Sequence, residues 1–198
     1  MARYAPAYID LTQYRERRDA NKAMAVLLQA ARRFPQVRTL QSPIVQFDAR
    51  DEAQLKRDLD LAQQPAALLS SVVNQIQEML QEGEAARDSL TEPRWQAAYD
   101  LAMGQAIAAV VRVDGYNGML AQLKTGKSFA DPKSDVWVLE SADEIGTTSL
   151  MRNKLTQARN YLQRVIDEHP GTPWAHVAEL ELKTPIGYVW KELDTDRR

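Results

Sequence analysis

Residues 155–190 read LTQARNYLQRVIDEHPGTPWAHVAELELKTPIGYVW, which predicts a helix, a tight turn, a second helix and an aromatic tail. Apolar side chains recur here every three or four residues, the spacing that places them on one face of a helix. The inner faces of the two helices comprise Ala158, Tyr161, Leu162, Val165 and Ile166, and then Trp174, Ala175, Ala178 and Leu182. The stretch therefore predicts a closing helical hairpin with its tail laid back on the rest of the molecule.

The turn between these helices is specified by five consecutive residues. Proline disfavours the helical conformation in the residue before it, so Pro170 ends the first helix at His169. Gly171 is free to adopt left-handed backbone angles that other residues avoid. Thr172 is a good N-cap and Pro173 a good first helical residue, because the N–H that proline lacks would be unpaired there.

The hairpin also has a local similarity to one tetratricopeptide-like unit. Ala158, Leu162, Val165 and Pro170 fit the second helix of such a unit, whose full repeat is about 34 residues. No second copy lies one period upstream. A single hairpin at residues 155–183 is therefore favoured over a repeat array.

The 198 residues predict a mainly α protein: one helical domain built as a bundle of long antiparallel helices, with at most one short β-like segment. We divide residues 1–198 into four parts. These are an N-terminal helix with an extended connector (1–48), a long helical hairpin (49–125), an irregular segment (126–148), and the C-terminal hairpin with its tail (149–198).

The first part predicts one helix followed by an extended connector. Asp10 or Thr12 would cap a helix that continues to about Phe34, where Pro35 stops it. Residues 36–48 alternate weakly and contain a proline, which favours an extended connector over a paired central strand.

The second part predicts two long helices. Residues 51–81 are rich in good helix formers, and Pro65 predicts a kink or a break within them. The second helix spans residues 93–124, with Thr91 as its cap and Gly126 at its C-terminal end. Its many small side chains allow close approach of a neighbouring helix, so we expect this helix to be central. Gly104, Gly115 and Gly118 are either close-packing positions or hinges, and we favour packing.

The third part carries the only β-like run, DVWVLE at residues 135–140. A lone short strand needs a partner, so it either pairs with the tail near residues 186–190 or lies across the bundle.

None of the reactive motifs that the sequence suggests is complete. Residues 125–128, TGKS, resemble the end of a phosphate-binding loop, but Ala121 stands where that loop needs glycine and a helix leads in. His169 and His176 lack further zinc ligands at suitable spacing, and His169 is interpreted as interacting with a helix dipole. Cysteine is absent, which excludes disulfides and thiol nucleophiles. We assign no catalytic, cofactor-binding or metal-binding residue.

Charge is distributed unevenly along the chain. The net charge is −2, which provides no basic field for nucleic acid, and no apolar run is long enough to enter a membrane as a spanning helix. Residues 1–40 carry eight Lys/Arg and three Asp/Glu, whereas residues 51–92 carry three and nine. Either the two regions attract one another, or the N-terminal region is a basic contact surface for an acidic partner.

Several strings resemble a known bacterial region. They are EPRWQA (92–97), YDLAMG (99–104), GYN (115–117) and EHPGTPWA (168–175), followed by Glu181-Leu182, Thr184-Pro185 and Gly187. Together they are similar to the helical region downstream of the von Willebrand factor type A domain in a group of planctomycete proteins. The D-x-S-x-S metal motif and the alternating α/β pattern of the type A domain itself are missing. The resemblance therefore implies a C-terminal helical region of a longer protein, with metal-dependent binding belonging to its neighbour.

Three functions remain, in order of preference. The first is a non-catalytic protein-interaction or scaffold module, without cofactor, whose partner is a protein. The second is a small-ligand or substrate-binding domain with a groove near Trp137, between residues 93–124 and 126–148. The third is an enzyme, which would require a deep cleft gathering Asp143, Glu144 and either His169 or His176.

Overall fold

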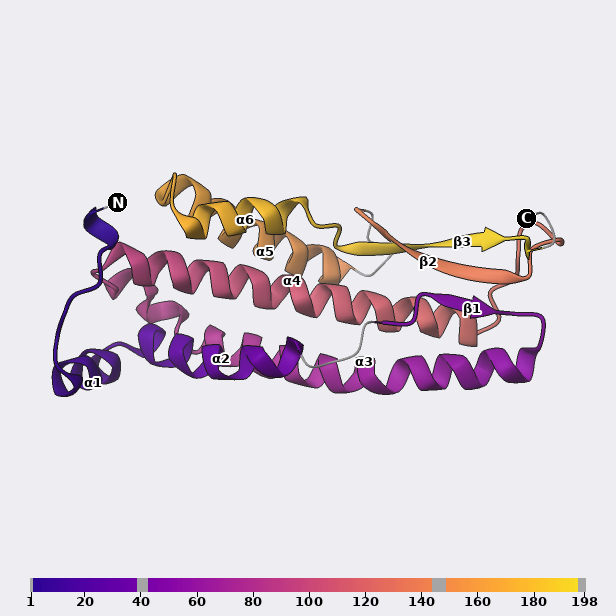
Figure 1. The fold of residues 1–198 in the computed structure, drawn as a ribbon, viewed down its shortest axis with the longest axis horizontal. Helices are drawn as coiled ribbons and strands as arrows, with labels where there is room; N and C mark the ends of the chain where they lie inside the picture. The colour runs from indigo at the N-terminus through magenta and orange to yellow at the C-terminus, as the bar shows by residue number, and fades with distance from the viewer. Residues whose placement is uncertain (1, 39–42, 144–148, 196–198) are drawn as a thin grey trace.

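Helix α4, Pro93–Lys124, runs along the centre of the molecule and contacts α2, α3, α5, α6 and β3. The computed structural model describes residues 2–38, 43–143 and 149–195; Glu144 lies outside them. Figure 1 shows α2 and α3 on one side of α4 and α5 and α6 on the other. The remaining helices are η1 Ala2–Tyr4, α1 Leu11–Ala20, α2 Lys22–Arg38, α3 Glu52–Gln81, η2 Glu84–Ser89, α5 Ser149–Glu168 and α6 Pro173–Lys183. The mainly α prediction is confirmed.

Close packing around α4 depends on its small residues. A Cβ atom on Gly104 would lie 2.7 Å from Cγ of Leu162 and 3.3 Å from the carbonyl oxygen of Ala158, both on α5. That contact is too short for any side chain, so Gly104 is what lets the two helices approach. The predicted packing role is confirmed for Gly104. It was wrong for Gly118, where a Cβ atom would meet nothing within 4 Å, and at Gly115 the nearest atom, on Tyr188, would be at an ordinary contact distance of 3.8 Å. None of the described helices combines the length and apolar character needed to cross a bilayer.

The N-terminal region differs from the single predicted helix. Asp10 caps α1 as expected, because its side chain accepts a hydrogen bond from the backbone N–H of Gln13. The chain then becomes extended at Asn21, whose side-chain oxygen accepts from the N–H of Met24 and so caps a second helix, α2. Asparagine competes for backbone partners in this way, and that competition divides the helix.

Neither proline within a helix ends it. Helix α2 continues through Pro35 to Arg38, so the predicted stop was wrong, and α3 continues through Pro65 to Gln81. Each proline removes one backbone hydrogen bond. The residues four positions earlier, Ala31 and Leu61, are exposed, so water can bind the carbonyl groups left without a partner.

A three-stranded antiparallel sheet lies beside the second half of α4 (Figure 1), in the order β1 Gln46–Asp48, β2 Val136–Ala142, β3 Gly187–Leu193. The predicted pairing of the β-like run with the C-terminal tail is confirmed, but the limit of one β-like segment was wrong. Trp137 in β2 lies opposite Phe47 in β1 and Glu192 in β3. The sheet buries these aromatic side chains against α4 in a second core cluster with Tyr116 and Leu120.

Most of the predicted helix ends are observed. Gly171 has a φ of +70° and Thr172 accepts a hydrogen bond from the N–H of Ala175, so the hairpin turn forms as expected. Gly126 has a φ of +91° and ends α4. Thr91 is not the cap of α4, because Glu92 occupies that position without a side-chain hydrogen bond.

Candidate functional site

Of the residues considered for catalysis, the structure describes Asp143, His169 and His176. His169 is buried, whereas His176 is exposed on α6. Asp143 lies near the end of β2. Among the described residues, no three His, Asp or Glu side chains gather in a way that would hold a metal ion.

Trp137, proposed to line a ligand groove, is only 2% exposed. Its ring stacks on Phe129 with centroids 4.4 Å apart and meets the edge of Trp190 at 5.9 Å. Aromatic side chains therefore fill the space beside it.

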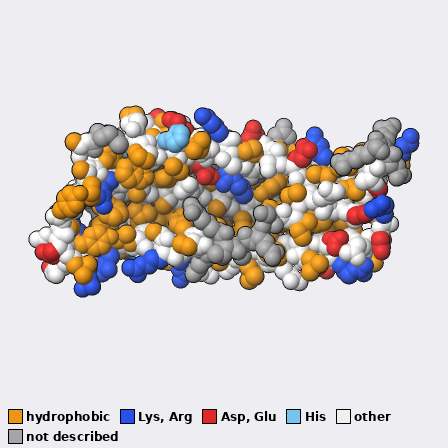
Figure 2. All heavy atoms as spheres, in the orientation of Figure 1, with side chains coloured by type: hydrophobic (Ala, Val, Ile, Leu, Met, Phe, Trp, Pro, Cys, Tyr) orange, Lys and Arg blue, Asp and Glu red, His pale blue; other side chains and the backbone are white. Residues whose placement is uncertain are grey.

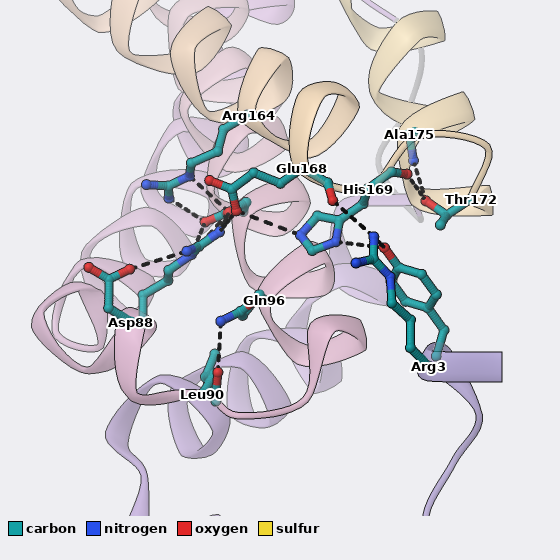
Figure 3. Close-up of polar contacts among 12 residues, drawn as sticks. Arg3, Asp88, Leu90, Gln96, Arg164, Glu168, His169, Thr172 and Ala175 are labelled. Carbon is teal, nitrogen blue, oxygen red and sulfur yellow. Dashed lines mark hydrogen bonds and ion pairs between the residues drawn. The ribbon is translucent and has the colours of Figure 1, made fainter. Parts of the chain in front are cut away.

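A buried ion network joins η2, α4 and α5 at one end of the bundle (Figure 3). Asp100, on α4, is fully buried and accepts hydrogen bonds from Nε of Arg87 at 3.1 Å and from Nε of Arg164 at 2.9 Å. Glu168, at the end of α5, binds Nη2 of Arg87 at 2.7 Å. Burial alone would lower the pKa of Arg87, but its hydrogen bonds to Asp100 and Glu168 raise it above the ordinary value. Arg87 also donates to the exposed carboxylate of Asp88 at 3.1 Å. Three carboxylates and two guanidinium groups thus satisfy one another, and this arrangement fits a structural role better than proton transfer.

A series of hydrogen bonds connects η1 to His169, next to the ion network. Arg3 donates to the hydroxyl oxygen of Tyr4 at 2.8 Å, and that hydroxyl lies 3.0 Å from Nδ1 of His169. Because the Tyr4 oxygen already accepts from Arg3, we assign its own proton to the bond with Nδ1, which leaves the ring proton on Nε2. Burial lowers the pKa of His169, against the raising effect of the carboxylate of Glu168, so the imidazole is neutral at pH 7. The structure thus adds a specific contact to η1 at the C-terminal end of α5, where the sequence predicted a dipole interaction.

An open hollow of about 730 Å³, here called the N-terminal groove, lies between the segment after η1, the α1–α2 junction and the start of α4. Its walls include Ala7, Met24 and Trp95. Tyr8, next to Ala7 in the chain, is 98% exposed, and Leu11 is 62% exposed. Figure 2 shows hydrophobic side chains gathered at the end of the molecule where Figure 1 places α1, with Lys and Arg side chains along the edge below. The groove itself has a mixed lining, with polar residues such as Arg17, Ser89 and Glu92 beside the apolar ones. Exposed apolar side chains next to polar groups are typical of a protein-binding site.

No protein-family model, curated protein or solved structure matches this chain. We therefore interpret the site from its own geometry.

The sequence predicted neither the groove nor the ion network. One signal for the network was present: Asp100 interrupts the apolar face that continues to Met103. A charge at such a position predicts a buried partner, because an unpaired buried charge is costly. The partners Arg87 and Arg164 carried no comparable signal.

Proposed function

We propose that this chain is a non-catalytic helical module that binds a protein partner through the N-terminal groove. The observation that carries the proposal is the pairing of a hollow beside Trp95 with two large side chains, Tyr8 and Leu11, that the fold leaves in solvent. Burying them against a partner would contribute roughly 1.5–3 kcal/mol for each side chain.

The charge around the groove favours an acidic partner. Residues 1–33 carry seven Lys/Arg and three Asp/Glu. Arg17 and Lys22 are paired with Glu92 and Glu82, which agrees with attraction between neighbouring regions of opposite charge. Within the described part of the chain, exposed Arg15 on α1 forms no ion pair, although its charge helps to lower the pKa of nearby Asp19. Its guanidinium group would attract carboxylates on the partner.

Arg94 adds a recognition element at the edge of the groove. Its guanidinium lies 4.7 Å from the centroid of the Trp95 ring, and both residues line the small hollow that adjoins the groove. Nε of Arg94 faces Glu92 at 3.9 Å, and the stacked guanidinium keeps its other N–H donors available for carboxylates. We therefore expect a peptide segment in which an apolar anchor is flanked by Asp or Glu.

Peptide selection from a random displayed library tests the proposal directly. The selected peptides should be enriched in Asp and Glu around one aromatic or aliphatic residue, and NaCl should weaken their binding. Tyr8→Ser should raise the Kd at least tenfold without affecting folding. Leu68→Ser is the matched control, because Leu68 is also exposed but lies on α3, and it should change the Kd less than twofold. Basic peptides, or equal affinity for Tyr8→Ser, would refute the assignment.

The sequence resemblance supports a place for this module beside a von Willebrand factor type A domain. In such a protein the neighbouring domain would bind metal and ligand, and the helical module would recruit a second protein. The genomic reading frame tests this arrangement: an upstream D-x-S-x-S motif within an α/β pattern is expected, and an unrelated upstream frame would contradict it.

A further inference from the structure

Helix η1 is attached to the rest of the protein at the turn between α5 and α6, beside His169 (Figure 3). Tyr4 is buried there, with its hydroxyl 3.0 Å from Nδ1 of His169 and its ring centroid 5.8 Å from that of Trp174. Arg3 donates to the backbone carbonyl of Glu168 at 3.3 Å. Because η1 has only three residues and cannot persist alone, its position depends on contacts of this kind.

The position of η1 in turn sets one wall of the N-terminal groove. Ala5 and Ala7 follow η1 in the chain, and both line the groove together with Met24 and Trp95. The backbone N–H of Ala5 donates to the carbonyl of Ala2 at 3.1 Å, so the start of this wall is hydrogen-bonded to η1 itself. Movement of η1 would therefore move the wall.

His169 is the group at this attachment that titrates near neutral pH. It is 2% exposed, and its Nε2 is buried without a hydrogen-bond partner among the described residues. The charged and titratable groups that face the ring are Arg3 and Tyr4 on η1, Arg87 on η2, Asp100 on α4 and Glu168 on α5. Both carboxylates already bind Arg87, so a positive charge on the imidazole would be poorly compensated.

Protonation of His169 would also change its hydrogen bond to Tyr4. Nδ1 accepts the Tyr4 proton when the ring is neutral, whereas both nitrogens of an imidazolium are donors. The Tyr4 oxygen would then face two cationic donors, Nδ1 of His169 and Nη2 of Arg3, which lies 2.8 Å away. These like charges repel one another, and the hydroxyl proton of Tyr4 would lose its acceptor in a buried site.

We propose that η1 is a pH-sensitive latch: protonation of His169 releases η1 from the α5–α6 hairpin and opens the groove wall formed by Ala5 and Ala7. The effect on partner binding rests on the function proposed above, whereas the release of η1 does not. Once exposed, the imidazole would have its ordinary pKa of 6.5. Since the latched ring is neutral, lowering the pH from 7.5 to 5.5 should raise the equilibrium constant for release by about tenfold.

Electron paramagnetic resonance measures this release without any partner. The chain contains no cysteine, so Ala2→Cys provides a single attachment point for a nitroxide at an exposed position on η1. The immobilised signal should dominate at pH 7.5, and the ratio of mobile to immobilised signal should rise by about tenfold at pH 5.5. In His169→Asn, whose amide oxygen can accept from Tyr4 but does not titrate, the spectra should not change over this range. His176→Gln is the matched control, because it removes the exposed histidine and should behave as wild type.

Tyr4→Phe keeps the test decisive if His169→Asn does not fold. It removes only the hydroxyl and keeps the ring beside Trp174. At pH 7.5 its ratio of mobile to immobilised signal should exceed that of wild type by about two- to tenfold, the effect of losing one hydrogen bond. The latch is overturned if the wild-type spectra do not change with pH, if His169→Asn changes as wild type does, or if Tyr4→Phe has the wild-type spectrum.

Peptide binding tests the link between the latch and the groove. The Kd of a selected acidic peptide without histidine should rise by about two- to tenfold from pH 7.5 to 5.5 with wild type, and by less than about twofold with His169→Asn. The peptide stays charged in this range, because Asp and Glu have ordinary pKa values of about 4. A Kd that does not change with pH would overturn the control of the groove by η1. If no peptide binds, the proposed function is refuted, while the spectra still decide whether η1 is released.

Discussion

Replacing Asp100 by Asn should destabilise the protein strongly, because it removes the charge from the centre of the buried network while keeping the side-chain size. Asp100 is fully buried and binds two guanidinium groups. Arg87 is itself almost fully buried, with its side chain 9% exposed, and would retain Glu168 at 2.7 Å and Asp88 at 3.1 Å, both of them partly or largely exposed to solvent. Arg164 is 35% exposed and can turn toward water.

The expected loss in the free energy of unfolding follows from the difference in burial between Arg87 and Arg164. Removing one partner of a buried ion pair typically costs about 3–5 kcal/mol, since it leaves a buried charge uncompensated. Most of the loss should come from Arg87. Urea denaturation followed by circular dichroism measures the change in the free energy of unfolding. An Asp100→Asn, Arg164→Met double-mutant cycle should show coupling of about 0.5–3 kcal/mol.

Asp60 provides the matched control. It is an aspartate on α3 that pairs with Lys124 at 2.5 Å, but its side chain is 66% exposed. Asp60→Asn should cost less than about 1 kcal/mol. A loss at Asp100→Asn no larger than that at Asp60→Asn would show that the network contributes little to stability, and would refute the reasoning.

Three further substitutions test packing and protonation. Gly104→Ala should destabilise the protein by about 1–3 kcal/mol, because the new Cβ atom would clash with Leu162. Gly118→Ala should stabilise it by about 0.5–1 kcal/mol, because a Cβ atom there meets nothing within 4 Å. Equal changes in thermal melts of the two variants would contradict the packing argument. Because the folded-state pKa of His169 is lowered from its usual 6.5, the unfolded chain binds more protons as pH falls below that value. Wild type should therefore lose more stability than His169→Gln between pH 7.5 and 5.5 in urea titrations, and parallel losses would exclude the effect. Trp174→Ala should lower the free energy of unfolding by about 2–3 kcal/mol. This is less than the roughly 3–5 kcal/mol typical of a fully buried ring, because Trp174 is only half-buried. An unchanged melting temperature would place Trp174 at the surface.

Features that act over a few residues were predictable. Pro170, Gly171, Thr172 and Pro173 specify the hairpin turn through backbone sterics and capping, and the helix ends there are observed as expected. The length of α4 was likewise predictable, since Pro93 begins it and a glycine follows its end. The same local reasoning overlooked Asn21 as a cap and gave too much weight to the helix prolines.

Only the tertiary structure decided the sheet, the network and the N-terminal groove. Strand β1 has three residues and forms because β2, about 90 residues later, offers backbone partners. Arg164 reaches Asp100 across 64 positions of sequence, and the N-terminal groove joins Ala7 to Trp95. Local sterics and caps are encoded in neighbouring residues. The packing of the helices decides which distant side chains become neighbours and where space is left between them.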